Sequence, residues 1–201
     1  MKVTAIKDRR LPFLILLIAI LCLTAFVLWW AKWRTYHFAV VQPGVLYRCG
    51  NRGVGELATA ARRGKIRTVV TLIDDQELAD TGKPQFAEEA KWCREHGVRL
   101  ERISVPLGGW PTSGDVRQFL SVVSDKQNQP VMVHCAQGVR RTGMMVAAYE
   151  RSVLGWDPAK CRDSMLTFGH SQRTVGDVQR FIEVYDPKTG AVPEGLPKGD
   201  E

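Results

Sequence analysis

An uninterrupted apolar segment near the N-terminus is the longest hydrophobic pattern in the sequence. Residues 11–31, between Arg10 and Lys32, contain no charged side chain. A helix of this length spans about 31 Å, which matches the hydrocarbon thickness of a bilayer. The run is longer than a typical signal-peptide core, and it ends in the bulky Trp29 and Trp30 instead of a small-residue cleavage site. The pattern therefore predicts an uncleaved transmembrane helix over residues 11–31, with a cleaved signal peptide as the alternative.

After a predicted linker over residues 32–44, two kinds of pattern alternate through a predicted domain over residues 45–186. The run at 66–73 is too apolar and too rich in β-branched residues for a half-exposed strand, so it predicts a buried parallel one. Alternating elements of this kind predict an α/β fold with a central, mainly parallel sheet flanked by helices. Residues 187–201, rich in Pro, Gly and charge, are predicted to form a flexible tail. The remaining elements are strands at 46–48, 98–105 and 130–134, and helices at 56–63, 84–96, 113–127, from 142 onwards, 158–168 and 175–185.

The net charge of +7 is concentrated at the N-terminus, which removes the argument for nucleic-acid binding that it would otherwise support. Residues 1–36 carry six of the 28 basic residues and one of the 21 acidic residues, so the rest of the chain is only +2. A basic segment over residues 1–10 precedes the apolar run, whereas only Lys32 and Arg34 follow it closely. The bias favours a cytoplasmic N-terminus and a C-terminal domain outside the cytoplasm, which means the periplasm in a bacterium.

Cysteine and histidine spacing gives no reason to expect a metal site. No two of the five cysteines form a C-x-x-C pair, and His96 and His170 have no partners at metal-ligand spacing. No metal and no cofactor are therefore predicted. Cys49, Cys93 and Cys161 are interpreted as structural, although a pair among them could form a disulfide in an oxidising compartment.

The residues with the most distinctive chemistry lie in the loop after the predicted strand at 130–134. This loop reads His-Cys-Ala-Gln-Gly-Val-Arg-Arg-Thr-Gly over residues 134–143. A strand-to-helix loop at the carboxyl edge of a parallel sheet gathers backbone N–H groups and the positive end of a helix dipole around one point. Such a point favours a tetrahedral phosphate. Cys135 lies in that field, which lowers a thiol pKa, and Arg141 can offer a planar fork to two phosphate oxygens.

The spacing His-Cys-x5-Arg-Thr-Gly resembles the signature loop of cysteine-dependent protein tyrosine and dual-specificity phosphatases. LeuTyrArgCysGlyAsn at 46–51 is similar to the "YRSGQP" opening of the atypical group found in bacteria, fungi and plants. ThrValValThrLeuIle at 68–73 and ProValMetValHisCys at 130–135 look like two strands of that group. The resemblance covers roughly residues 43–170. It implies a phosphatase fold and metal-free hydrolysis of phosphate monoesters through a phosphocysteine intermediate.

The resemblance also implies roles for the loop residues. Cys135 would attack phosphorus, while Arg141 would bind the phosphoryl oxygens and stabilise charge in the transition state. The Thr142 hydroxyl would donate to the thiolate and ease its departure, and His134 would orient the loop. Arg140 adds a second cation at the rim, which either favours highly phosphorylated substrates or is simply solvated. The predicted phosphate-binding residues are Ala136, Gln137, Gly138, Val139, Arg140 and Arg141.

In this family the leaving group is usually protonated by an aspartate on a mobile loop ahead of the nucleophile's strand. The corresponding segment here contains Asp115 as its only carboxylate, so Asp115 is the predicted general acid. Asp115 also lies in the first turn of a predicted helix with Ser113 as its N-cap, where an acid is favoured by the helix dipole alone. Asp74 and Asp75, after the strand at 66–73, are the alternatives.

These inferences predict a single-pass membrane phosphatase whose substrates are phosphorylated proteins, with phosphotyrosine ahead of phosphoserine and phosphothreonine. An inositol phosphate or phosphoinositide phosphatase is the first alternative, because the same loop serves such enzymes in atypical relatives. A phosphate-binding protein without catalytic activity, a pseudophosphatase, is the second alternative. The predicted partners are the substrate and, through the N-terminal helix, the membrane.

Overall fold

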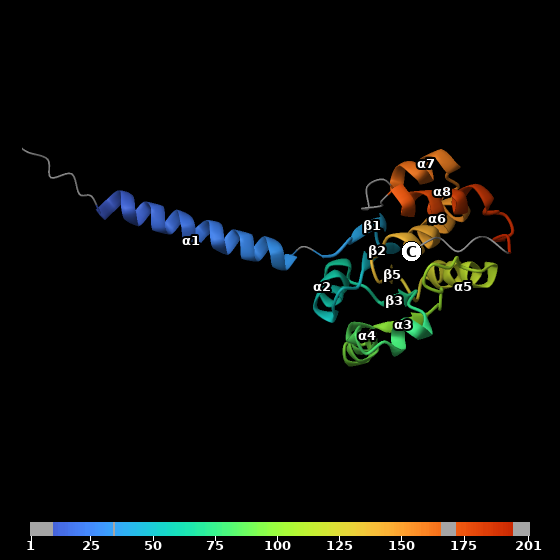
Figure 1. Cartoon of the computed structure of the whole chain (residues 1–201), viewed down its shortest axis with the longest axis horizontal. Coiled ribbons are helices and arrows are strands. Elements are labelled where there is room, and N and C mark those ends of the chain that lie inside the picture. Colours follow the sequence, from blue (N-terminus) through green and yellow to red (C-terminus); the bar gives the residue numbers. More distant parts are fainter. Residues whose placement is uncertain (1–9, 34, 166–171, 195–201) are drawn as a thin grey trace, which may run out of the picture. The chain divides into compact units, whose positions relative to one another are not determined.

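The structure is a computed structural model that describes residues 10–33, 35–165 and 172–194 (Figure 1). The chain divides into two units, residues 1–34 and 35–201, and each is described by itself. The basic residues before Arg10, the end of the helix predicted at 158–168 and the tail beyond Glu194 lie outside the described residues.

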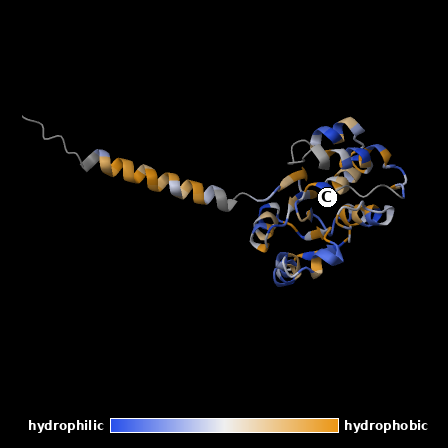
Figure 2. Ribbon diagram, in the orientation of Figure 1, coloured by the Kyte–Doolittle hydropathy of each residue, from blue (hydrophilic) through white to orange (hydrophobic). Residues whose placement is uncertain are grey.

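The first unit contains helix α1 (Arg10–Trp33). Its Pro12–Trp30 segment has a mean hydropathy of 2.8, and Figure 2 shows hydrophobic residues along most of its length. Among the described residues, this is the one helix long and apolar enough to cross a membrane, and a signal sequence would have the same properties. The helix predicted over residues 11–31 is therefore present, while its place in a membrane and its orientation stay predictions.

The second unit is built on a five-stranded sheet in the order β1-β2-β5-β3-β4. The edge strand β1 is antiparallel to β2, and all other neighbours are parallel. The predicted α/β fold with a mainly parallel sheet is thus confirmed. The strands are β1 (Ala39–Gln42), β2 (Leu46–Gly50), β3 (Thr68–Thr71), β4 (Arg99–Arg102) and β5 (Val131–Cys135).

Helices cover both faces of the sheet, so every residue of β3 and β5 is buried. Along β5, Val131 and Val133 pack with α5, α6 and α8, whereas Met132 packs with α2 and α4 on the opposite face. This alternation is the two-residue period of a strand. The helices are α2 (Val54–Gly64), α3 (Asp75–Ala79), α4 (Pro84–Glu95), α5 (Ser113–Ser124), α6 (Arg140–Ser152), α7 (Pro158–Met165) and α8 (Gln172–Val184).

The predicted linker over residues 32–44 is wrong in its second half, which contains β1. Ala39 pairs with Arg48, and the turn at Pro43-Gly44 returns the chain into β2. Gly44 has a φ of +74°, a conformation that glycine adopts without steric cost. The second unit accordingly begins at Thr35, ahead of the predicted boundary at residue 45.

The first part of the predicted flexible tail is ordered against α5. Asp186 forms a β-bridge with Ala191. The Ser113 hydroxyl accepts a hydrogen bond from the Val192 amide (2.8 Å) and donates one to the Val192 carbonyl (3.2 Å). These bonds satisfy backbone groups that a solvated tail would leave to water. The prediction of flexibility over residues 187–201 is therefore wrong for its described part, which ends at Glu194.

Candidate active site

The loop predicted to bind phosphate lies where theory places ligand sites in parallel sheets. Strand β5 ends at Cys135 and helix α6 begins at Arg140, so residues 136–139 connect a central strand to a helix N-terminus. The parallel register aligns Cys135 with Gly50 of β2. Cys135 is only 3% exposed, at the bottom of the loop. The structure thus brings together Cys135, Arg141 and Thr142 at one edge of the sheet.

Gly138 allows the loop to turn back tightly over strand β2. Its φ is +70°, and a Cβ atom here would lie 2.2 Å from the Cys49 carbonyl oxygen. Any side chain at this position would therefore displace backbone. The turn directs the Gly138 amide to the Cys135 Sγ, to which it donates a hydrogen bond at 3.2 Å. The Gly138 carbonyl points away from the thiol and accepts a hydrogen bond from buried Arg48 at 2.7 Å.

The environment of Cys135 favours its thiolate form. Burial alone raises the pKa of the thiol, but the positive charge of Arg141 and the polar groups of Thr142 and Gly138 outweigh burial and lower the pKa below its ordinary value. In contrast, burial raises the pKa of Cys93 and of Cys161 to about 12. Cys135 is therefore distinguished from other buried cysteines by the groups that surround it.

Glu77 fixes the Arg141 guanidinium beneath the loop in a two-pronged ion pair. The guanidinium donates to both Glu77 oxygens, at 2.5 and 3.0 Å, and to the backbone carbonyls of Leu72 and Val105. Burial alone lowers the pKa of Arg141, but the hydrogen bond it donates to Glu77 and the nearby thiolate charge raise the pKa above its ordinary value. Both side chains are almost fully buried. Sequence reasoning missed Glu77, because its position three residues after Asp74 is typical of a helix cap and does not indicate a partner for Arg141.

A second buried acid, Glu89 of α4, contacts two residues that adjoin Cys135. Its Oε1 lies 2.6 Å from His134 Nε2, and its Oε2 accepts a hydrogen bond from the Asn51 side chain at 3.0 Å. The backbone N–H of Asn51 donates to the carbonyls of Cys135 and Ala136. Burial lowers the pKa of His134, but the charge and hydrogen bond of Glu89 outweigh it and raise the pKa. An imidazolium is therefore favoured beside Cys135.

Arg140 ties the loop to its neighbours. Its guanidinium donates to the carbonyls of Gly108 (2.9 Å) and Gly109 (2.8 Å), and its Nε donates to Asp177 of α8 at 2.7 Å. The side chain is only 15% exposed. The interpretation of Arg140 as a solvated rim cation is therefore wrong, because its donors hold the segment between β4 and α5.

The predicted general acid lies at the start of α5. Thr112 and Asp115 form a capping box, in which Asp115 Oδ2 accepts from the Thr112 amide (2.7 Å) and hydroxyl (2.8 Å). The N-cap is thus Thr112, and the prediction of Ser113 as the N-cap is wrong. Of the two alternative candidates for the general acid, Asp75 is exposed and forms an ion pair with Arg102.

Asp74 lies close enough to Arg141 to feel the charge of its guanidinium. It caps α3, accepting a hydrogen bond from Glu77, and its second oxygen accepts one from the Leu107 amide, both at 2.7 Å. Burial raises the pKa of Asp74, but these hydrogen bonds and the charge of Arg141 outweigh burial and lower it. Asp74 therefore links α3 to the segment between β4 and α5.

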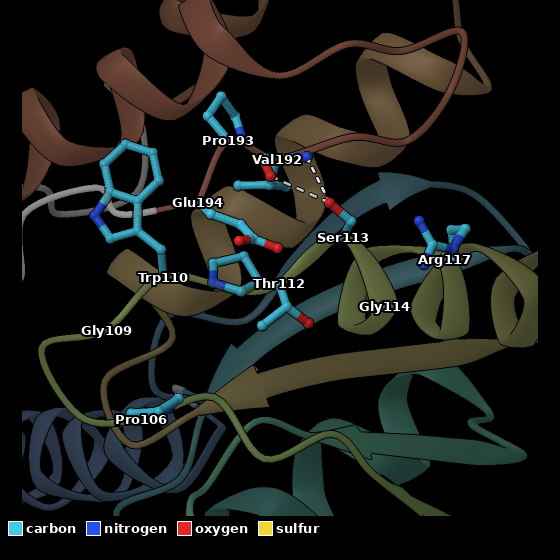
Figure 3. Close-up of a pocket in the computed structure, with 11 residues that line it drawn as sticks. Pro106, Gly109, Trp110, Thr112, Ser113, Gly114, Arg117, Val192, Pro193 and Glu194 are labelled. Atoms are coloured by element: carbon cyan, nitrogen blue, oxygen red, sulfur yellow. Dashed lines mark hydrogen bonds between the residues drawn. The ribbon is translucent and has the colours of Figure 1, made fainter.

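A cavity of about 550 Å³ adjoins that same segment (Figure 3). Its wall contains no residue of the 134–141 loop, so the cavity lies beside the β4–α5 segment and not over Cys135. Within the described parts of the chain, no three His, Cys, Asp or Glu side chains are grouped as a metal site would need. The cavity is lined by Pro106, Gly109, Trp110, Pro111, Thr112, Ser113, Gly114, Arg117, Val192, Pro193 and Glu194.

Comparison with known proteins agrees with this geometry. A family model described as "DSP-PTPase phosphatase fused to NAD+ Kinase" matches residues 61–177. The rice protein "Inositol diphosphatase DSP1" is 29% identical over 154 residues, covering 75% of this chain and 64% of its own length. The match therefore spans less than two thirds of that relative.

Two solved structures share the fold. The catalytic core of the PP-IP phosphatase SIW14 from S. cerevisiae superposes with a TM-score of 0.62 at 23% identity, covering 76% of this chain and 87% of that one. TpbA from P. aeruginosa superposes with a TM-score of 0.60 at 22% identity, covering 77% and 88%. The second unit thus shares the fold of these two proteins.

Proposed function

Because the chain belongs to the dual-specificity and tyrosine phosphatase family of cysteine-dependent enzymes, we propose that it hydrolyses phosphate monoesters of proteins, phosphotyrosine above all. The observation that supports this most is the state of Cys135. The thiol pKa is lowered, and the Gly138 amide donates to the sulfur. A thiol that ionises more readily than usual supplies the thiolate nucleophile that this chemistry requires.

In the first step, the Cys135 thiolate attacks phosphorus, an S–P bond forms and the ester P–O bond breaks. The loop amides and Arg141 stabilise the charge on the three phosphoryl oxygens as it develops. The hydrogen bonds that Arg141 donates to Glu77, Leu72 and Val105 orient its guanidinium in advance, which reduces the reorganisation needed in the transition state.

In the second step, water attacks phosphorus, the S–P bond breaks and inorganic phosphate leaves. The departing thiolate is stabilised by Thr142 and by the Gly138 amide, the same groups that lower its pKa in the free protein. Asp115 is the proposed donor of the proton to the leaving oxygen in the first step. To act in this way it must exchange its capping bonds with Thr112 for the leaving group.

The charge around the loop favours a substrate with a single phosphate. Residues 136–139 are uncharged, and Arg140 spends its donors on Gly108, Gly109 and Asp177. An inositol pyrophosphate carries many phosphates and needs several cations around the one that reacts. Hydrolysis of inositol pyrophosphates is the second candidate function, favoured by the rice relative that is named an inositol diphosphatase.

A direct comparison of the two substrates tests the proposal. The full chain in detergent, with a chelator present, is assayed on a phosphotyrosine peptide and on an inositol pyrophosphate, with Cys135→Ser as the control. We expect a higher kcat/KM on the peptide and no turnover by the Ser variant. The opposite preference would replace the proposal with the second candidate. Binding of inorganic phosphate without turnover of either substrate would make the protein a pseudophosphatase.

We also propose that α1 anchors the protein in a membrane with its N-terminus in the cytoplasm. The support is the apolarity of Pro12–Trp30 and the excess of basic residues before it. A reporter fused after Glu201 should be active only outside the cytoplasm. A cytoplasmic signal would reverse the orientation, and recovery of a shortened, soluble chain would identify the segment as a signal peptide.

A further inference from the structure

The residues that follow Arg34 in the sequence pack directly against the loop that holds Cys135. The Tyr36 carbonyl accepts a hydrogen bond from the Gly50 amide at 2.8 Å, and Gly50 is the register partner of Cys135. The Tyr36 ring lies over the position of a Gly50 side chain, since a Cβ atom there would be 2.6 Å from Tyr36 Cδ1. Arg52 covers the ring, with its guanidinium carbon 3.6 Å from the ring centroid.

His37 reaches from this segment to the loop itself. Its Nδ1 lies 2.6 Å from the Gln137 carbonyl oxygen, and its ring stacks on Tyr36 with the centroids 4.1 Å apart. Since a carbonyl oxygen can only accept, Nδ1 carries the proton in this bond. The backbone of His37 has a φ of +51°, a left-handed conformation that costs about 1 kcal/mol for a residue with a side chain. The stacking on Tyr36 and the hydrogen bond to Gln137 offset the cost of this backbone conformation.

The contact sets the direction of one peptide group in the loop. In a trans peptide, the carbonyl of one residue and the amide of the next point in opposite directions. While His37 holds the Gln137 carbonyl outward, the Gly138 amide points inward, where it donates to Cys135 Sγ. If this peptide turned over, the carbonyl would face the thiolate and the incoming phosphate, and a stabilising donor would become a repelling acceptor.

The carbonyls on either side are held by other residues. The Ala136 carbonyl accepts from the Asn51 amide at 2.9 Å, and the Gly138 carbonyl accepts from Arg48. Asn51 and Arg48 are fully buried within the sheet and its loops. The Gln137 carbonyl differs, because its partner comes from a partly exposed segment at the edge of the second unit.

We propose that His37 is a positioning residue that keeps the Gln137–Gly138 peptide in the orientation needed for catalysis. It touches neither the phosphate nor the sulfur and acts through Gln137. The proposal rests on the proposed phosphatase function, but the orientation of the peptide can be measured without a substrate. Because His37 is close in sequence to the end of α1, the residue that sets the loop belongs to the stretch that joins the apolar helix to the sheet.

Three variants of the full chain in detergent separate the hydrogen bond from the stacking. His37→Phe keeps a ring on Tyr36 but has no donor, while His37→Asn retains a donor for the Gln137 carbonyl. His96→Phe is the matched control, because the His96 ring also stacks on an aromatic residue, Trp92, and its Nδ1 also bonds a backbone carbonyl. That carbonyl belongs to Trp92 on α4 and not to the loop.

Two measurements read out the variants. The first is kcat/KM on an aryl phosphate, and the second is the pH dependence of Cys135 alkylation by iodoacetate, which reports the thiol pKa and needs no turnover. We expect His37→Phe to lower kcat/KM about tenfold, the loss that corresponds to one hydrogen bond. Its alkylation profile should move to higher pH, His37→Asn should recover most of both effects, and His96→Phe should match the wild type.

Equal kcat/KM and equal alkylation profiles for His37→Phe and the wild type would overturn the proposal. So would a loss that His37→Asn fails to recover, since the donor would then not be the cause. If His37→Phe does not fold, His37→Ala replaces it, and failure of both to fold would assign His37 to folding instead. An inactive wild type whose alkylation profile still depends on His37 would refute the proposed function and leave this inference standing.

Discussion

Two segments follow parallel strands at the same edge of the sheet, and they differ in how they are held. In the loop after β5, the flanking charged side chains are fixed by buried partners, Glu77 for Arg141 and Glu89 for His134. The segment between β4 and α5, which leads to Asp115, is held through the Leu107 amide and through carbonyls that Arg140 binds. The loop after β5 is therefore positioned by buried acids of α3 and α4, whereas the β4–α5 segment is positioned partly by its hydrogen bonds with Arg140 of α6.

The comparison assigns separate tasks to two neighbouring arginines. Arg141 points beneath the loop to Glu77, while Arg140 reaches across to Gly108 and Gly109. In the proposed mechanism, phosphate binding therefore depends on the loop after β5, and proton transfer depends on the β4–α5 segment, which Arg140 holds to that loop. Burying charges such as those of Glu77 and Glu89 is costly unless they are paired, which gives each ion pair a defined geometry.

Replacing Arg141 with lysine should affect the fixed loop most. Lysine keeps the charge but cannot bond both Glu77 oxygens and the phosphate in one plane. We expect Arg141→Lys to lose about 10²–10³-fold in kcat/KM on an aryl phosphate. Arg151→Lys on the same helix is the control, since Arg151 bonds only the Trp156 carbonyl among the contacts described. Activity of Arg141→Lys within a few-fold of wild type would show that the planar fork is dispensable.

Asp115→Asn tests the second segment. If Asp115 protonates the leaving oxygen, phenyl phosphate hydrolysis should fall about 10²-fold, whereas an activated nitrophenyl ester should fall only a few-fold. The experiment compares kcat on the two esters and the melting temperature of the variant. An equal loss on both esters, with a lower melting temperature, would mean that Asp115 acts only as the α5 cap with Thr112.

The sequence predicted the fixed loop well and its supports poorly, for a physical reason. In the proposed function Cys135, Arg141 and Thr142 act on one phosphate, so their spacing along a strand–loop–helix turn is set locally and is visible in the sequence. Glu77 and Glu89 come from α3 and α4, and they meet the loop only because the parallel sheet aligns distant segments. A buried acid among exposed acids on the same helix has no local signature.

In the fold as well, elements with a clear local pattern were predicted correctly, and elements without one were missed. The apolar run containing β3 predicted a buried strand correctly, because a parallel strand that is buried on both faces consists almost entirely of apolar and β-branched residues. Strand β1 was missed because its mixed edge pattern resembles a linker, and it is stabilised by pairing with β2. The five-residue helix α3 was missed because it is too short to show an amphipathic repeat, and the capping box of Asp74 with Glu77 was its one local signal.

Glu89→Gln tests whether the buried acid contributes through its charge. The amide keeps a hydrogen-bonding group beside His134 but no longer favours the imidazolium, whose pKa Glu89 raises. We expect about a tenfold lower kcat/KM and a Cys135 alkylation profile moved to higher pH. Glu88→Gln, the exposed neighbour on α4, should leave both unchanged. An unchanged alkylation profile in Glu89→Gln would limit Glu89 to a packing role.

The smallest expected effect concerns stability and Glu150 of α6. Burial raises the pKa of Glu150 to about 7, although hydrogen bonds from Ser164 and the charge of Arg48 oppose this. The folded state thus holds a proton that the unfolded state releases above its ordinary pKa of about 4.5, so stability falls as pH rises from about 4.5 to 7. We expect Glu150→Gln to flatten this dependence of the melting temperature by the equivalent of about 1–3 kcal/mol. An identical slope in both proteins would contradict the assignment.

The central claim is that Cys135 carries the phosphoryl group during turnover. The full chain is mixed with a phosphotyrosine peptide, quenched with acid within the first turnover and digested for mass spectrometry. We predict one added phosphoryl group on the peptide that contains Cys135, and none in Cys135→Ser, which should still bind inorganic phosphate through the loop amides. Turnover in which the phosphoryl group appears on another residue, or which persists in Cys135→Ser, would contradict the account.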